Sequence, residues 1–142
     1  MTGYLIDTNV VSELRKNRRC DPNVGAWQIE ASRHEMFISV ISMMEIRYGM
    51  LTVKRKDAAF AELLEAWYEG QVKEAFDGHV LPIDLAVCER CSTLLSERTR
   101  NLGDALISAT AYVNDLTIAT RNVADFADTG VELVNPWDGL RR

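Results

Sequence analysis

Short apolar runs alternate along this chain with longer segments whose apolar residues recur at helical spacing. Five runs have the length and apolar content of buried strands: YLI at 4–6, MFISV at 36–40, HVLPI at 79–83, LTIAT at 116–120 and VELV at 131–134. Strands separated by helices need crossover connections, which leave neighbouring strands parallel. The alternation therefore predicts an α/β fold in which helices cover both faces of a central, mostly parallel sheet.

Helices are expected between these strands, and local chemistry indicates where several of them begin. Asp21 followed by Pro22 is typical of an N-cap and a first helical position, and Asp84 is placed to cap another helix. A long amphipathic helix is expected over 54–76, with a kink or break at Gly70. Further helices are expected from about residue 9, over 41–51 and over 103–113, with a loop over 120–126.

The composition fits a single domain over residues 1–142. Apolar residues make up 47% of the chain and charged residues 26%, a balance typical of globular proteins. The net charge of −5 argues against coating nucleic acid by bulk charge, but it leaves room for local basic clusters. Such clusters occur at 15–19, at 54–56 and at Arg121, although 54–56 is explained more simply as solvated surface.

Cysteine usage and apolar run lengths indicate a cytoplasmic protein with no membrane partner. Three cysteines cannot all pair within one chain, so a reducing compartment is expected. The first residues lack the basic segment of a signal peptide, and Asp7 interrupts the early apolar run. The most apolar stretch, FISVISMMEI, is far too short to span a bilayer.

Four acidic residues follow the expected strands or lie near the start of the helices after them: Asp7, Glu45, Asp104 and Asp125. Ligands of open parallel sheets bind outside the carboxyl ends of the strands, so these side chains are expected to converge on one rim. Carboxylates at close range repel one another and favour binding of a cation. Oxygen ligands without thiolate or imidazole neighbours favour Mg²⁺ or Mn²⁺ over zinc.

Each of these acids also has a purely structural explanation. Asp7 and Asp104 are placed to act as helix N-caps, and Asp125 as a residue that hydrogen-bonds its own turn. Glu45 is flanked by methionine, isoleucine and tyrosine, and a glutamate among core residues needs a ligand role or a buried ion pair with an arginine. One common cause is a simpler explanation than four independent structural roles.

Four blocks of the sequence resemble PIN-domain ribonucleases, of the kind found as VapC or FitB toxins of type II toxin–antitoxin pairs. The blocks are LIDTNVVSEL at 5–14, ISMMEIRYG at 41–49, GDALISATAYVNDLTIATRNVADF at 103–126 and TGVELVNPW at 129–137. They follow the family's order and span nearly the whole chain. One departure is Leu102-Gly103, where relatives often have a proline nearby. The resemblance implies a PIN-like three-layer α/β/α domain.

The resemblance also implies a metal-dependent endoribonuclease that hydrolyses RNA phosphodiester bonds. Asp7, Glu45 and Asp104 would hold the principal Mg²⁺ or Mn²⁺ ion, directly or through water. Asp125 would help to hold a second ion or orient the attacking water.

Three further residues are expected to support this site. Thr120 falls at the family's small hydroxyl position beside the metal, and Asn9 supports the geometry of the family's D-x-N loop. Arg121 is a candidate RNA contact because it lies next to the site in the sequence.

The resemblance implies a cognate antitoxin as partner, a homodimer, and an assembly that reaches operator DNA through the antitoxin. An antitoxin helix is expected in a groove between the early helices and the segment 54–76, where Leu64, Trp67 and Tyr68 offer apolar contacts. Core packing or a dimer face is favoured for Trp67 and Tyr68 over base stacking.

Two other functions remain open. The chain could act chiefly as a subunit of an antitoxin–DNA repressor complex, with little catalysis of its own. A metal-dependent phosphatase of the haloacid dehalogenase type also begins with a strand and D-x-D, but Asn9 replaces the second acid here.

The pair Cys88 and Cys91 forms C-x-x-C, which a zinc site would need to complete with further ligands. Both cysteines lie within an expected helix and no second pair exists, so small apolar side chains that fill space are expected. Dinucleotide and P-loop motifs are absent from the sequence.

Overall fold

The computed structural model describes residues 3–140 and has a five-stranded parallel sheet at its centre. The strands are β1 (Gly3–Ile6), β2 (Glu35–Ser39), β3 (Val80–Leu81), β4 (Thr117–Ala119) and β5 (Leu133–Val134). They lie in the order β3-β2-β1-β4-β5, so the first strand of the chain is the middle strand of the sheet. The predicted central parallel sheet is therefore confirmed.

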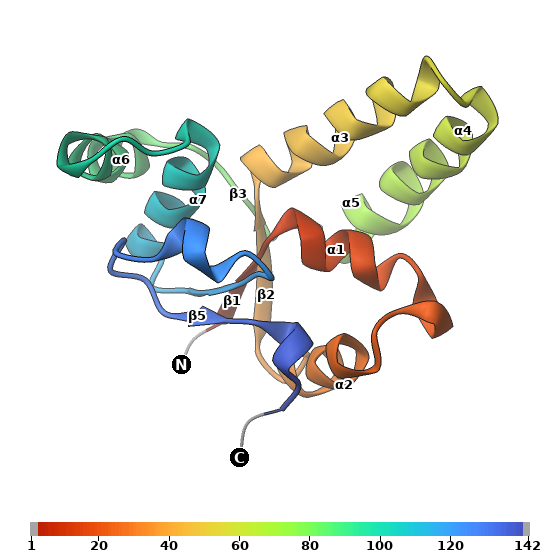
Figure 1. Ribbon diagram of the computed structural model, residues 1–142, viewed down its shortest axis with the longest axis horizontal. Coiled ribbons are helices and arrows are strands. Elements are labelled where there is room, and N and C mark those ends of the chain that lie inside the picture. Colours follow the sequence, from red (N-terminus) through yellow and green to blue (C-terminus); the bar gives the residue numbers. More distant parts are fainter. Residues whose placement is uncertain (1–2, 141–142) are drawn as a thin grey trace.

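Helices pack on both faces of this sheet and give three layers (Figure 1). One face is covered by α1 (Thr8–Leu14), α2 (Pro22–Ala31), α3 (Val40–Lys54), α4 (Ala58–Trp67) and α5 (Lys73–Ala75). The other face is covered by α7 (Leu102–Val113), against which α6 (Leu85–Glu97) packs. The α/β/α architecture is thus as expected.

Alternate side chains of β1 supply the two cores on either side of the sheet. Ile6 packs with residues of α1, α2 and α3, whereas Leu5 packs with Ile107 of α7 and with Ile118 of β4. Successive residues of a strand point to opposite faces, so one short strand contributes to both cores. Leu5 and Ile6 are each 1% exposed, and burying such a side chain contributes about 1.5–3 kcal/mol.

Two predicted N-caps are confirmed, and both fix the start of a crossover helix. The Asp21 side chain accepts a hydrogen bond from Asn23 N, with Pro22 at the first helical position. The Asp84 side chain accepts from Val87 N at the start of α6. Local side-chain chemistry therefore places both helix starts where the sequence predicted them.

Some predicted element boundaries are wrong. The long helix over 54–76 is not one element, because α3 runs on to Lys54 and Asp57 caps a new helix, α4. The interruption predicted at Gly70 is present as a π-helical turn, η2 (Tyr68–Val72), which separates α4 from α5. Residue 40 belongs to α3, since the Ser39 side chain already caps that helix.

Three short 3₁₀ turns complete the chain: η1 (Asn17–Arg19), η3 (Val123–Phe126) and η4 (Pro136–Asp138). The expected loop over 120–126 therefore contains one turn of helix. No helix within residues 3–140 has the length and apolarity needed to cross a membrane.

Candidate active site

The first candidate residue, Asp7, lies directly after the central strand and directly before α1. Its side chain is 7% exposed, and its backbone N–H donates to Ala119 O of β4 at 3.0 Å. Asp7 is also the N-cap of α1, because its Oδ1 accepts from Thr8 N at 2.8 Å. The capping role that the sequence allowed is therefore real, and it uses only one of the two carboxylate oxygens.

The second oxygen of Asp7 is held by the two supporting residues that the sequence singled out. Thr120 Oγ1 donates to Asp7 Oδ2 at 2.7 Å, and Asn9 Nδ2 donates to the same oxygen at 3.2 Å. Asn9 Nδ2 also lies 3.3 Å from Thr120 Oγ1. These bonds fix the orientation of the Asp7 carboxylate from two segments that are far apart in the sequence.

The segment that follows β4 is tied to the same group. Arg121 N donates to Asn9 Oδ1 at 3.2 Å, and Asn122 N donates to Thr120 Oγ1 at 3.0 Å. Thr120 is fully buried, while the Arg121 side chain is exposed with its guanidinium carbon 5.0 Å from the ring centroid of Trp137. Asn9 and Thr120 thus join the loops after β1 and β4.

Glu45 lies in the second turn of α3 and faces the same rim, but it is exposed. The inference that it sits among core residues is wrong, because its neighbours Met44 and Tyr48 are 60% and 72% exposed. Its Oε1 accepts a hydrogen bond from Thr8 Oγ1 at 2.8 Å. Thr8 was not among the expected site residues; its only signal in the sequence is a hydroxyl directly after Asp7.

Asp104 is the third residue of α7 and is not the cap of that helix. Asn101 is the N-cap, and its Oδ1 accepts from Asp104 N at 3.0 Å. The structural explanation that was open for the Asp104 carboxylate is therefore wrong. The helix begins one residue earlier than predicted, at Leu102, which leaves the Asp104 side chain available at the rim of the sheet.

Electrostatics place the four acids in one neighbourhood. Partial burial, followed by the charges of Asp125, Asp7 and Glu45, raises the pKa of Asp104 from 3.8 to about 6. Burial also raises the pKa of Asp7, and the charge of Asp125 adds to that rise, although three hydrogen bonds oppose it. Asp125 itself is exposed on η3, where its backbone N–H donates to Asn122 O at 3.0 Å.

The acids are near enough to perturb one another but do not form a closed cage. Within residues 3–140, no group of three or more histidine, cysteine, aspartate or glutamate side chains is arranged to hold a metal ion. Mg²⁺ keeps several waters and binds through one or two carboxylates, so an open, oxygen-only and negatively charged rim fits such an ion. The residues that could hold such an ion are the four acids whose charges act on one another here, Asp7, Glu45, Asp104 and Asp125.

The other candidate motifs have structural roles. Both cysteines are free thiols. Cys91 is buried against α7, as the space-filling explanation predicted, but that explanation is wrong for Cys88, which is exposed. Tyr68 is 6% exposed and belongs to the core, so it offers no grip to a partner. Trp67 is partly buried and lines a cavity of about 430 Å³ between α1, α2 and the η2–α5 segment.

Comparison with known proteins agrees with this geometry. A family model for the PIN domain matches residues 4–132. "VapC ribonuclease Y4jK" of Sinorhizobium fredii is 32% identical over 142 residues, which cover 94% of this chain and 97% of that protein. "Toxin FitB" of Neisseria gonorrhoeae is 32% identical over 143 residues, covering 94% of this chain and 97% of that protein.

A solved structure extends the likeness to three dimensions. "Structure of FitAB bound to IR36 DNA fragment" matches with a TM-score of 0.84 and 26% identity, covering 98% of both chains. The order of strands, the acids around the end of β1 and these matches give one conclusion: the chain belongs to the PIN domain family, in the group that includes VapC and FitB.

Proposed function

We propose that this protein is the toxin of a type II toxin–antitoxin module and an Mg²⁺- or Mn²⁺-dependent endoribonuclease. Its membership of the PIN domain family and its 32% identity to a VapC ribonuclease over nearly the whole chain support the class of reaction. The substrate is RNA, and the reaction is hydrolysis of a phosphodiester bond: water attacks the phosphorus, the P–O3′ bond breaks, and the products carry a 5′-phosphate and a 3′-hydroxyl.

The observation that best supports this proposal is the elevated pKa of Asp104. Burial is the largest cause of its rise to about 6, and the charges of Asp125, Asp7 and Glu45 add to it, so the folded protein holds negative charges together at a free-energy cost. A divalent cation at this place removes that repulsion. A site that functioned only as a set of helix caps would need no such crowding.

Each residue has a distinct role in this proposal. Asp7, oriented by Thr120 and Asn9, is the direct ligand of the cation, and Asp104 contributes charge from the opposite side. Glu45, held by Thr8, binds through water at the exposed edge of the rim. When bound, the cation offsets the negative charge of the scissile phosphate and makes water a stronger acid.

Asp125 and Arg121 act on the substrate side of the site. Asp125 is exposed and close enough to raise the pKa of both Asp7 and Asp104, so it is suited to orient the attacking water or to hold a second ion. Arg121 is exposed beside the site and is proposed to contact an RNA phosphate.

The test compares two aspartates that both cap helices. Asp7→Asn should lower cleavage of an RNA oligonucleotide by roughly 100-fold or more, because it removes a charge at the reacting site and keeps the shape of the cap. The matched control, Asp84→Asn, changes an exposed N-cap of α6 in the same way and should cut RNA at the wild-type rate.

Three further arms complete this experiment on the purified protein without a partner. Cleavage should require Mg²⁺ or Mn²⁺ and stop on addition of EDTA. A phosphatase would instead hydrolyse para-nitrophenyl phosphate, which the wild-type protein should leave intact. Equal cleavage by wild type and Asp7→Asn would exclude the assignment of Asp7.

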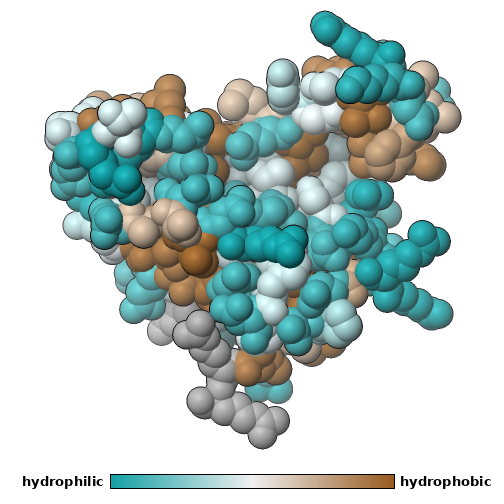
Figure 2. Space-filling view, viewed as in Figure 1, coloured by the Kyte–Doolittle hydropathy of each residue, from teal (hydrophilic) through white to brown (hydrophobic). Residues whose placement is uncertain are grey.

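Two surfaces favour an additional role as the partner of an antitoxin. The cavity beside Trp67 lies between the early helices and the η2–α5 segment, where an antitoxin helix was expected, and Arg15 and Gln28 also line it. Figure 2 shows apolar surface over the α3–α4 hairpin, where Met44, Leu51 and Leu63 are exposed. We propose that an antitoxin segment covers part of this region and links the protein to operator DNA.

A homodimer remains part of the proposal.

If the purified protein bound no divalent ion and cut no RNA, but formed a stable complex with its antitoxin on operator DNA, the repressor role would replace the enzymatic one.

A further inference from the structure

The loop between β4 and β5 carries Asp125, and its first half is fixed by the site itself. Thr120 and Asn122 are hydrogen-bonded to each other and, through Thr120, to Asp7. Phe126, the residue after Asp125, is 1% exposed and packs with Leu5 and Ile107. Asp125 therefore lies between a segment held by hydrogen bonds, Thr120 and Asn122, and the buried side chain of Phe126.

The second half of the loop contains no strand or helix, and its backbone bends sharply. Asp128 and Gly130 both have positive φ, at 63° and 80°. Thr129 is 2% exposed, and its Oγ1 donates to Phe126 O at 2.7 Å. An aspartate in the left-handed backbone conformation costs free energy, so contacts elsewhere must offset that cost.

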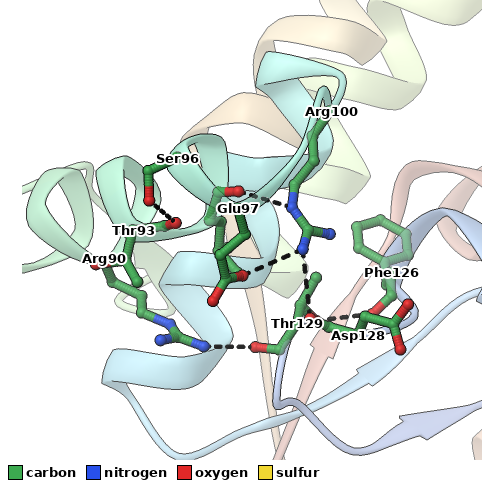
Figure 3. A network of polar contacts seen from close by, with 9 residues as sticks. Arg90, Thr93, Ser96, Glu97, Arg100, Phe126, Asp128 and Thr129 are labelled. Carbon is green, nitrogen blue, oxygen red and sulfur yellow. Dashed lines mark hydrogen bonds and ion pairs between the residues drawn. The ribbon is translucent and has the colours of Figure 1, made fainter.

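Two arginines from outside the loop supply those contacts, as Figure 3 shows. Arg90 of α6 donates from Nη2 to Thr129 O at 2.8 Å. Its guanidinium also stacks on the ring of Tyr112 of α7, with 3.8 Å between the guanidinium carbon and the ring centroid. A Cβ added to Gly130 would come within 3.2 Å of Arg90 Nη2, so the loop backbone lies directly against this group.

Arg100 connects the same loop to the start of α7. Its side chain is 6% exposed; Nε donates to Leu94 O at 2.9 Å, and Nη2 contacts Glu97 at 3.3 Å and Asp128 O at 3.4 Å. Arg100 directly precedes Asn101, the N-cap of the helix that carries Asp104. The Arg100 side chain thus joins the end of α6 to the segment after Asp125, from a residue that directly precedes the N-cap of α7.

Each arginine also leaves one buried nitrogen unpaired in the described part of the chain, so stabilising the fold does not fully account for the two side chains. Arg90 Nε and Arg100 Nη1 are buried, and neither has a hydrogen-bond partner within residues 3–140. A buried N–H without a partner lowers the free energy of unfolding, and buried charges are often replaced by apolar side chains at no loss of stability. Both side chains hydrogen-bond to backbone carbonyls of one short segment, so they can fix the position of that segment.

We infer that Arg90 and Arg100 are positioning residues that clamp 128–129 and so fix Asp125 relative to Asp7 and Asp104. This inference depends on the proposed function, since it gives the position of Asp125 a catalytic consequence. Groups that orient metal-site and catalytic carboxylates from behind change metal affinity or activity by roughly 10- to 100-fold when they are removed.

The experiment uses methionine, which keeps an unbranched apolar stem but removes the guanidinium, and with it the hydrogen bonds of both arginines and the stacking of Arg90 on Tyr112. Arg90→Met and Arg100→Met are each combined with wild-type Asp125 and with Asp125→Asn, and RNA cleavage is measured with Mn²⁺. Arg98→Met is the control, because Arg98 is an exposed arginine at the end of the same helix. Hydrogen exchange of amides 123–130 and the Tm are measured on the same proteins.

We expect each methionine variant to cleave RNA roughly 10-fold more slowly or worse, with faster exchange at 123–130. The lost hydrogen bonds lower the Tm, so the Tm is used to check that each variant is folded at the assay temperature. In the Asp125→Asn background the same substitutions should slow cleavage no further, because they act through Asp125. Rate losses that multiply in the double variants would overturn the inference, as would unchanged cleavage or unchanged exchange.

Failure of the proposed function gives a different pattern. Wild-type protein would then cut no RNA at all, and the exchange data would still decide whether the two arginines hold the loop. If one variant failed to fold, the other, or Arg100→Lys, which keeps the charge but not the fork, would take its place.

Discussion

A single carboxylate, Asp7, combines two roles that a sequence pattern cannot separate. One oxygen caps α1 and the other accepts bonds from Thr120 and Asn9, so the group is held rigidly while burial raises its pKa. Asp104 has no capping role and shows the larger effect of crowding. The two aspartates therefore differ in structural role, although both lie at the same rim of the sheet.

The pKa of Asp104 leads to a pH-dependent stability of the metal-free protein. A folded pKa of about 6, raised from 3.8, means that the folded state binds a proton where the unfolded state has lost it. The stabilisation is complete below the unfolded pKa and disappears as the pH rises through about 6. Asp104→Asn lacks this titration, so its Tm advantage over wild type should grow as the pH rises across that range.

Thermal melts in EDTA at a series of pH values measure this advantage. Asp84→Asn provides the baseline, because its exposed aspartate caps a helix away from the cluster. An Asp104→Asn advantage that shrank with rising pH would contradict the sign of the shift.

At the scale of elements, local chemistry predicted helix starts but not every helix end. Asp21, Pro22 and Asp84 act within a few residues of themselves, so the sequence alone was sufficient to place α2 and α6. The break between α3 and α4 was missed because the amphipathic pattern continues across it, although Asp57 is a good cap. Propensity is local, whereas the packing of α4 back on α3 depends on the rest of the chain.

Backbone conformation at two glycines makes a prediction for these elements. Gly49 lies within α3, and a Cβ added there meets no atom within 4 Å, so Gly49→Ala should stabilise the protein by about 1 kcal/mol. Gly78 is equally free of neighbours but has a φ of 75°, so Gly78→Ala should destabilise it by about 1 kcal/mol. Urea denaturation measures both changes, and shifts of the same sign would contradict the assigned backbone geometry.

For the whole molecule, topology explains which parts of the site the sequence could supply. Because ligands bind at the carboxyl ends of parallel strands, the sequence was sufficient to predict that the four acids lie at one rim of the sheet. It could not show that Thr8 bonds Glu45, or that Arg90 and Arg100 hold the loop after Asp125, because those contacts depend on how α6 and α7 pack. The exposure of Glu45 was also missed, since apolar neighbours on a helix do not tell which face is buried.

A cation that binds only the folded molecule should stabilise it as a whole. At a free Mn²⁺ concentration of roughly 100 times Kd, mass action adds about 2.7 kcal/mol to the free energy of unfolding. Asp7→Asn should lose most of this gain and Asp84→Asn should keep it, as thermal melts with and without Mn²⁺ would show. Equal gains in wild type and Asp7→Asn would exclude a shared ion at the rim.

The hydrogen bond between Thr120 and Asp7 joins positions 113 apart in the chain. Asp7 therefore emerges from the ribosome long before Thr120 has been synthesised. The nascent chain cannot assemble the site until β4 has emerged and paired with β1. We expect a chain that ends before β4 to lack the site and therefore to be inert.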